Sequence, residues 1–336
     1  MSTFKHYQTA HCENGVTLGL LKNIGINPIS EPLIFGIGSG LFYIHVPFMK
    51  VHGAPTISFR SFPGAIFKRT CDALDIKVER RKFSSPEKAQ RFLDEKLSEN
   101  IPVGCQVGVF NLSYFPKEYR FHFNAHNLIV YGKNGGNEYL ISDPVMEEIT
   151  TLDQRTLEKV RFAKGILAPK GQIYYPIHTN ELNKKLIQKG IKKGIKRTIN
   201  DMIALKMPFI GVRGIKYTAN QIEKWPSKVG ERKAKLFLGQ IVRMQEEIGT
   251  GGGGFRYIYA AFLKEAAQWM EEDFYDKASE KIHQAGNLWR ESAVLMAGIY
   301  KGRLDTQKDY QDVANILREI SQLEKKCFLF LKKHMK

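Results

Sequence analysis

The sequence predicts an α+β domain in the N-terminal half of the chain, followed by a mainly α-helical domain. Up to about residue 180, short segments rich in Val, Ile, Phe and Tyr alternate with helical patterns and are bounded by Gly, Pro or Asn. From about Asn180 onward, apolar residues instead recur at the helical period over long segments. We therefore expect domains at residues 1–170 and 171–336, with a boundary near residues 165–180.

The composition excludes several classes of protein. Of the 336 residues, 43% are hydrophobic and 25% are charged, which is typical of globular domains and not of disordered chains. No segment approaches the roughly 18 consecutive apolar residues of a membrane span, and residues 1–12 have no apolar core of a secretory signal. We therefore expect a cytoplasmic protein with no membrane partner.

Six strands are expected in the first half, with helices between the early ones. The strands are residues 41–46, 56–60, 77–83, 103–110, 127–132 and 138–142. Residues 65–74 have helical spacing, and Ser85-Pro86-Glu87 opens a helix to Leu97, with Ser as N-cap and Pro at the first position. Residues 133–137 (KNGGN) lie between two strands and are typical of a hairpin turn.

Long helices are expected in the second half, at residues 182–205, 233–247, 255–270, 275–300 and 310–334. The glycine run 249–254 separates two of them. This half also holds much of the net charge of +17, because residues 181–243 contain 16 Lys and Arg against four acidic residues. A basic surface of this size attracts an acidic partner, whereas the plainer interpretation is a solvated basic face.

Cys12 is the first candidate for chemistry. The four cysteines (Cys12, Cys71, Cys105 and Cys327) are scattered and form no CxxC pair, so we expect free thiols and no metal site. Cys12 directly precedes helical apolar spacing, which predicts a thiol at a helix N-terminus, where the dipole favours a thiolate. The alternative is a small buried hydrophobic residue.

His126 and Asp143 are the candidate partners of Cys12. His126 immediately precedes an apolar strand, and Asp143 follows the next strand, one hairpin later. Antiparallel pairing of these strands would bring the two side chains together. In a Cys, His and Asp arrangement, the imidazole accepts the thiol proton and the carboxylate orients the ring. Taken singly, the two residues are equally consistent with a core histidine and a turn aspartate.

Several motifs together resemble a known family. They are His11-Cys12-Glu13-Asn14-Gly15, residues 30–40 (SEPLIFGIGSG), His126, Asp143-Pro144, residues 249–256 (GTGGGGFR) and Leu288-Trp289. This combination is similar to the butirosin-biosynthesis H proteins, in both their N-terminal domain and the helical domain that follows. The glycines of residues 36–40 do not have the spacing of a dinucleotide-binding loop.

The resemblance implies a papain-like fold for the N-terminal domain and a cysteine acyltransferase activity. The butirosin enzyme moves an acyl group from an acyl carrier protein thioester to an amine of an aminoglycoside. Carried over to this sequence, Cys12 is the nucleophile, His126 is the general base and then acid, and Asp143 orients His126. No cofactor is implied beyond a phosphopantetheine-linked acyl donor, and the acceptor is a small-molecule amine.

Three residues near Cys12 are candidates for binding the substrate or its oxyanion. Papain-like enzymes place an oxyanion-hole Gln further upstream of the cysteine than Gln8, which is only four residues before Cys12. Gln8 is therefore a candidate donor beside the backbone N–H of Cys12. Asn14 belongs to the shared motif, and Glu31 is either a cleft residue or an ordinary loop carboxylate.

The glycine run is a candidate anion site. Backbone N–H groups around Gly251 and Gly252, at the start of a helix with Arg256, would cradle a phosphate or carboxylate. The Lys-Ser or Lys-Thr ending of a nucleotide P-loop is absent, which argues against ATP. The alternative is a simple turn between helices.

The expected reaction is a ping-pong transfer through an acyl-enzyme to an amine deprotonated by His126, with an acyl carrier protein docked on the basic helices. Two alternatives stay open. With water as the acceptor, the same residues make a papain-like cysteine peptidase or amidase. In a non-enzymatic protein, Cys12 is structural and the basic helices bind nucleic acid with a steep salt dependence. Acyl transfer itself needs no nucleic acid, and the sequence does not indicate an oligomeric state.

Overall fold

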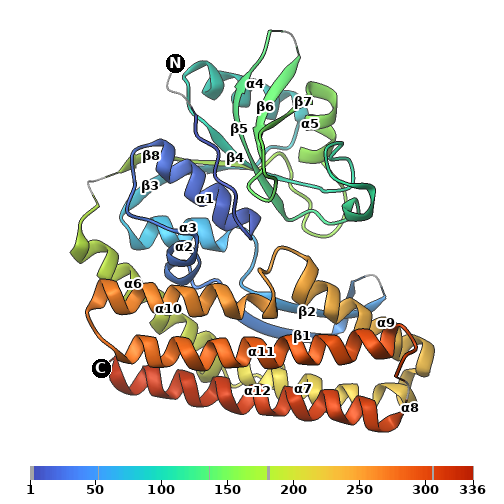
Figure 1. Cartoon of the computed structure of the whole chain (residues 1–336). Coiled ribbons are helices and arrows are strands. Elements are labelled where there is room, and N and C mark those ends of the chain that lie inside the picture. The colour runs from blue at the N-terminus through green and yellow to red at the C-terminus, as the bar shows by residue number, and fades with distance from the viewer. Residues whose placement is uncertain (1–3, 52, 136, 180–181, 305, 336) are drawn as a thin grey trace. The chain divides into compact units, whose positions relative to one another are not determined.

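The chain divides into two compact units. The computed structural model describes residues 4–51, 53–135, 137–179, 182–304 and 306–335. The first unit comprises residues 1–34 and 66–182, and the second comprises residues 35–65 and 183–336. These units differ from the expected ranges 1–170 and 171–336 mainly because residues 35–65 pack with the helical half. The first unit contains most of the strands and the second is mainly helical, so the α+β class is confirmed (Figure 1).

A six-stranded sheet organises the first unit. The strand order is β3-β8-β4-β5-β6-β7, and all neighbours are antiparallel (Figure 1). The strands are β3 (Ile76–Arg81), β4 (Val103–Val107), β5 (His126–Lys133), β6 (Glu138–Ser142), β7 (Thr150–Asp153) and β8 (Ile173–Thr179). The sequence did not predict β7, which has only four residues, or β8, whose Pro176 weakens a strand pattern. The expected hairpin turn joins β5 to β6, although its Gly136 lies outside the described residues.

Several helices accompany this sheet along the chain. They are α1 (Cys12–Asn23), α2 (Glu31–Ile37, which runs across the boundary between the units), α3 (Ala65–Ala73), α4 (Pro86–Ser98), the short 3-10 turn η1 (Lys117–Tyr119) and α5 (Gln154–Arg161). Helices α1, α4 and α5 begin at a capping side chain. Ser85 caps α4, as expected, by accepting the N–H of Lys88 at 3.3 Å. Ser30 accepts the N–H of Leu33 at 3.1 Å in the same way. Residues 31–37, for which no helix was expected, are therefore helical.

Successive residues of β5 point to opposite faces of the sheet, which sets where each helix packs. Leu128 and Val130 join a core with Leu93 of α4 and Leu157 of α5. On the other face, Gly19 of α1 lies so close to Ile129 that a Cβ atom there would be 2.7 Å from the Ile129 Cδ1. Helix α1 is therefore held against the sheet beside the start of β5.

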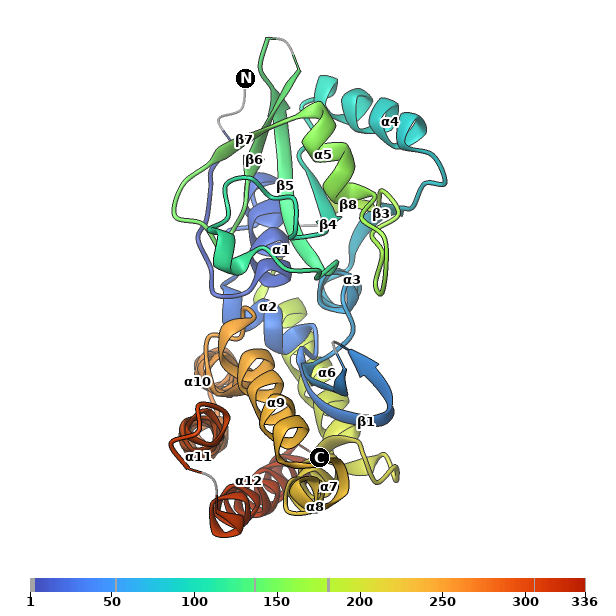
Figure 2. The same ribbon diagram turned by 90° about the vertical axis from the view of Figure 1, so that its right-hand side faces the viewer.

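Long helices and one hairpin build the second unit. The elements are β1 (Leu41–Val51), β2 (Ala54–Arg60), α6 (Lys184–Ile199), the π-helical turn η2 (Asn200–Ala204), α7 (Gly211–Ile222), α8 (Trp225–Val229), α9 (Glu231–Val242), the π-helical turn η3 (Arg243–Glu247), η4 (Gly253–Phe255), α10 (Arg256–Met270), α11 (Phe274–Tyr300) and α12 (Gln307–His334). The five expected long helices are all present. Helices α10, α11 and α12 lie side by side and are seen close to end-on in Figure 2. Among the described residues, no helix is long and apolar enough to cross a membrane.

The β1–β2 hairpin belongs to the helical unit because its aromatic side chains complete that core. Tyr43 of β1 stacks on Trp289 of α11, with ring centroids 5.7 Å apart. Phe59 of β2 meets the same indole edge-on at 5.2 Å. Gly36 packs against the ring of Phe262, where a Cβ atom would be 2.0 Å from the ring. Gly36 therefore serves close packing, as does Gly40, where a Cβ atom would be 2.2 Å from the ring of Phe35.

Candidate active site

Cys12 is the first residue of α1. His11 is the N-cap, and its Nδ1 accepts the N–H of Asn14 at 3.4 Å. The Cys12 side chain is nearly buried, with 7% of its surface exposed. Its sulfur therefore lies at the positive end of a helix dipole, which favours the anionic form.

Gly15 lets α1 approach the segment that carries Asp143. A Cβ atom at Gly15 would lie 2.3 Å from Cβ of Pro144 and 2.1 Å from Oγ1 of Thr9, far inside van der Waals contact. The N–H of Thr9 donates to the carbonyl of Pro144 at 2.7 Å, which fixes this approach. A side chain at position 15 would thus clash with Thr9 and with Pro144, the residue that follows Asp143.

The pairing of β5 with β6 brings His126 and Asp143 together. His126 begins β5, Ser142 ends β6, and Ile129 is the register partner of Ser142. Asp143, the next residue, therefore turns toward the start of β5. Its Oδ2 lies 2.6 Å from Nε2 of His126, and both side chains are buried.

Asp143 is held by further donors. The hydroxyl of Tyr114 donates to Oδ2 at 2.7 Å, and the N–H of Val145 donates to Oδ1 at 3.2 Å. Burial opposes charging of the His126 ring, but the charge and hydrogen bond of Asp143, with a contribution from Cys12, outweigh it and raise the pKa of His126 to about 10. The ring of Phe115 meets His126 edge-on, with centroids 5.3 Å apart. His126 is therefore fixed in position and favoured as imidazolium.

Cys12 lies beside His126 and Asn127. The imidazole makes a hydrogen bond with the Cys12 side chain, and its Nε2 is the atom engaged by Asp143. From the next residue of β5, Nδ2 of Asn127 lies 3.8 Å from the same sulfur. Cys12, His126 and Asp143 thus form one hydrogen-bonded chain.

The other predicted residues near Cys12 have structural partners. Glu31 accepts the N–H groups of Ala10 at 3.0 Å and His11 at 2.9 Å, and the amide of Asn14 at 3.4 Å. Burial raises the pKa of Glu31, although these hydrogen bonds oppose the shift. Glu31 and Asn14 therefore hold the turn before Cys12, whereas Gln8 is exposed.

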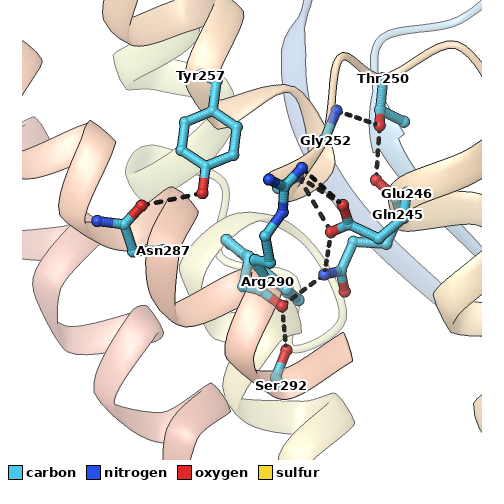
Figure 3. Close-up of polar contacts among 10 residues, drawn as sticks. Gln245, Glu246, Thr250, Gly252, Tyr257, Asn287, Arg290 and Ser292 are labelled. Atoms are coloured by element: carbon cyan, nitrogen blue, oxygen red, sulfur yellow. Dashed lines mark hydrogen bonds and ion pairs between the residues drawn. The ribbon is translucent and has the colours of Figure 1, made fainter. Parts of the chain in front are cut away.

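The glycine run lies in the second unit, and one of its N–H groups donates to a carboxylate of the protein itself. Gly253 N–H donates to Glu246 at 3.1 and 3.3 Å, and Gly252 N–H donates to Oγ1 of Thr250 at 3.0 Å. Figure 3 shows Arg290 reaching the same Glu246, at 3.5 Å. Glu246 is therefore held by Gly253 and Arg290, and the anion site expected around Gly251 and Gly252 stays a prediction.

Arg256, the last residue of that motif, is fully buried. Its guanidinium forms two hydrogen bonds with Glu324 of α12, at 2.8 and 3.0 Å, and a third with the carbonyl of Gly254 at 2.7 Å. Nε1 of Trp289 donates to the same carboxylate at 2.9 Å. The arrangement ties α10, α11 and α12 together and leaves Arg256 with internal partners.

The remaining cysteines differ from Cys12 in their surroundings. All four are buried thiols outside any disulfide, as expected. Burial raises the pKa of Cys71, of Cys105 and of Cys327, the last to about 12, so these three thiols are unreactive near neutral pH. Only Cys12 has an imidazole partner among the described cysteines.

Comparison with known families agrees with this organisation. A family model described as "Butirosin biosynthesis protein H, N-terminal" matches residues 11–144, a range that contains Cys12, His126 and Asp143. A second model, "Domain of unknown function (DUF4872)", matches residues 155–331, more than half of the chain. The chain therefore belongs to the DUF4872 family, its N-terminal region matches the butirosin biosynthesis protein H N-terminal domain, and the expected resemblance is confirmed. A comparison with curated proteins returns no match.

Proposed function

We propose that this protein is a cysteine-dependent acyltransferase of antibiotic biosynthesis, with Cys12, His126 and Asp143 as a papain-like catalytic triad. The observation that carries the proposal is the hydrogen-bonded chain from Asp143 through His126 to a cysteine at a helix N-terminus. The match of residues 11–144 to the N-terminal domain of butirosin biosynthesis protein H supports the biosynthetic role.

In the first half-reaction, the Cys12 thiolate attacks the carbonyl carbon of a thioester. The tetrahedral oxyanion then collapses, the carbon–sulfur bond to the donor breaks, and His126 gives its proton to the departing thiol. In the second half-reaction, an amine attacks the acyl-enzyme and loses a proton to His126. The amide leaves, and Cys12 returns to the thiolate beside imidazolium.

The donor in this proposal is an acyl group on the phosphopantetheine arm of a carrier protein. Helix α6 offers a matching surface, because its exposed face is basic, with Lys185, Lys189, Lys192, Lys193 and Lys196. Carrier proteins are acidic, so charge complementarity would speed their association and make it sensitive to salt. The peptidase or amidase alternative has no observation in its favour beyond the shared nucleophile.

The test is trapping of the acyl-enzyme. The protein is mixed with an acyl-pantetheine thioester, and the mass of the Cys12 peptide is measured before and after an amine is added. We expect an acyl adduct on Cys12, its absence in Cys12→Ser, and its conversion to an amide by the amine. An adduct released equally fast without the amine would instead indicate a hydrolase, and no adduct would refute the proposal.

A further inference from the structure

Asn127 makes a buried contact with Cys12 that the proposed mechanism does not use. Its side chain is 2% exposed and lies on β5 directly after His126. Nδ2 is 3.8 Å from Sγ of Cys12 and 3.2 Å from the carbonyl oxygen of Ala125. Both acceptors therefore face the same end of the amide.

The orientation of this amide is determined by its partners. The carbonyl of Ala125 only accepts hydrogen bonds, so the NH2 group must face it. At the other end, the hydroxyl of Tyr174 on β8 donates to Oδ1 at 2.8 Å. A flipped amide would set its oxygen against the Ala125 carbonyl, so an N–H is held toward the sulfur.

We propose that Asn127 is a positioning residue whose amide, held by Tyr174 and Ala125, donates a hydrogen bond to the ionised sulfur of Cys12. The inference rests on the proposed function of Cys12. Hydrogen bonds to a charged group are stronger than neutral ones, so the contact favours thiolate over thiol. It also stabilises the sulfur as it leaves the acyl-enzyme, when His126 has just taken the proton of the amine.

Other titratable groups lie near Cys12 or near the residues that contact it. His126 interacts with Cys12 and Asp143, and Tyr174 interacts with Cys12, Glu13, Cys105 and Arg80. Burial raises the pKa of Tyr174 and of Cys105, so both are neutral near neutral pH. Glu13 is bound by the N–H groups of Ile66 and Phe67 at 2.9 and 3.2 Å. Asn127 carries no charge, so its effect is separable from that of His126.

The test is the pH profile of iodoacetamide alkylation at Cys12 in the full-length protein, read by peptide mass spectrometry. Asn127→Leu keeps the volume and removes the donor, and Tyr174→Phe removes only the group that orients it. We expect the midpoint of the profile to rise by about one pH unit in Asn127→Leu, and by less in Tyr174→Phe.

Gln106→Leu is the matched control. Gln106 is the register partner of Asn127 on β4 and is also a buried amide, but it donates to Asn124 and Leu167 at 2.8 and 2.9 Å. The Gln106→Leu substitution should lower the stability of the protein without moving the midpoint of the alkylation profile at Cys12. If Asn127→Leu does not fold, Tyr174→Phe decides.

The outcomes separate this inference from the proposed function. The midpoint in the parent protein could be low and depend on His126, yet be unchanged in both Asn127→Leu and Tyr174→Phe. That result overturns the role of Asn127 alone. An equal shift in Gln106→Leu also overturns it, because the effect would then follow from general loosening of the sheet. An ordinary thiol profile in the parent protein, unaffected by His126→Ala, overturns the proposed function and this inference together.

Discussion

The carboxylate of Asp143 controls the charge of the imidazole beside Cys12. In Asp143→Asn, the ring of His126 loses the negative charge that favours its protonation, so its pKa should fall from about 10 by more than one unit. The pH titration of the imidazole resonances by NMR measures this change. Asp153→Asn, which alters an exposed helix cap in the same unit, is the control. A His126 midpoint that stays near its parent value in Asp143→Asn would contradict the electrostatic account.

Site residues were predictable where the pattern that marks them lies in the adjacent sequence. Cys12 was recognisable from the helical pattern that follows it, and His126 and Asp143 from two strands joined by a short hairpin. Asn127 and Tyr174 were missed, because their meeting requires the adjacency of β5, β4 and β8, which are far apart in the sequence. Asn127 had one available signal, since it follows His126 at the start of the strand. The roles of these residues stay predictions.

At the scale of helices, breaking the buried ion pair between α10 and α12 should destabilise the second unit more than breaking an exposed pair. Glu324→Gln leaves the guanidinium of Arg256 fully buried without a carboxylate. We expect this change to lower the free energy of unfolding by about 3 kcal/mol in urea denaturation. The exposed pair Lys184–Glu271 is the control, and Glu271→Gln should cost less than about 1 kcal/mol. Equal effects of the two substitutions would refute this ranking.

The contact between β1 and α7 should respond to acid. Thr218 donates its hydroxyl proton to the carbonyl of Gly214 at 3.0 Å, so it accepts from His45 Nδ1 at 2.8 Å. That hydrogen bond requires a proton on Nδ1, which the neutral ring can supply. Burial lowers the pKa of His45 to about 4. The unfolded chain therefore binds a proton more readily than the folded one below pH 6.5, and stability should fall as the pH drops from 6.5 to 4.

The measurement is urea denaturation at pH 7 and pH 5. His45 should account for about 2 kcal/mol of the loss at pH 5, and His45→Gln, which keeps a donor for Thr218, should remove that part. His334→Gln changes an exposed histidine and serves as the control. An identical acid sensitivity in His45→Gln and the parent would show that other groups are responsible.

Helices with a regular apolar period were predictable from the sequence. Elements whose formation depends on neighbours in the folded structure were not. The long helices α10, α11 and α12 follow from their apolar spacing. Strand β8 was missed because it contains Pro176. Helix α2 was not predicted, although Ser30 and Pro32 form a start signal similar to that of α4, with a capping Ser and a Pro in the first turn.

At the scale of the whole molecule, the second unit needs a segment from the first sixty-five residues. Tyr43 and Phe59 pack against Trp289, so a fragment of residues 183–336 lacks part of its core. We expect that fragment to melt without a cooperative transition, whereas the same fragment with residues 35–65 fused through a flexible linker should melt cooperatively. Circular dichroism during heating measures both. Equal cooperativity in the two fragments would show that the hairpin is dispensable.

Because each unit is built from two separate segments of the chain, recombination cannot easily exchange one unit alone. The backbone passes between the two units at residues 34–35, 65–66 and 182–183. A single recombination crossover exchanges everything on one side of a point, so no single point separates the genes for the two units. A crossover at residues 182–183 would join the helices of one parent protein to the β1–β2 hairpin of another. Tyr43 and Phe59 of that hairpin would then face a Trp289 environment with which they did not evolve. The two units should therefore descend together.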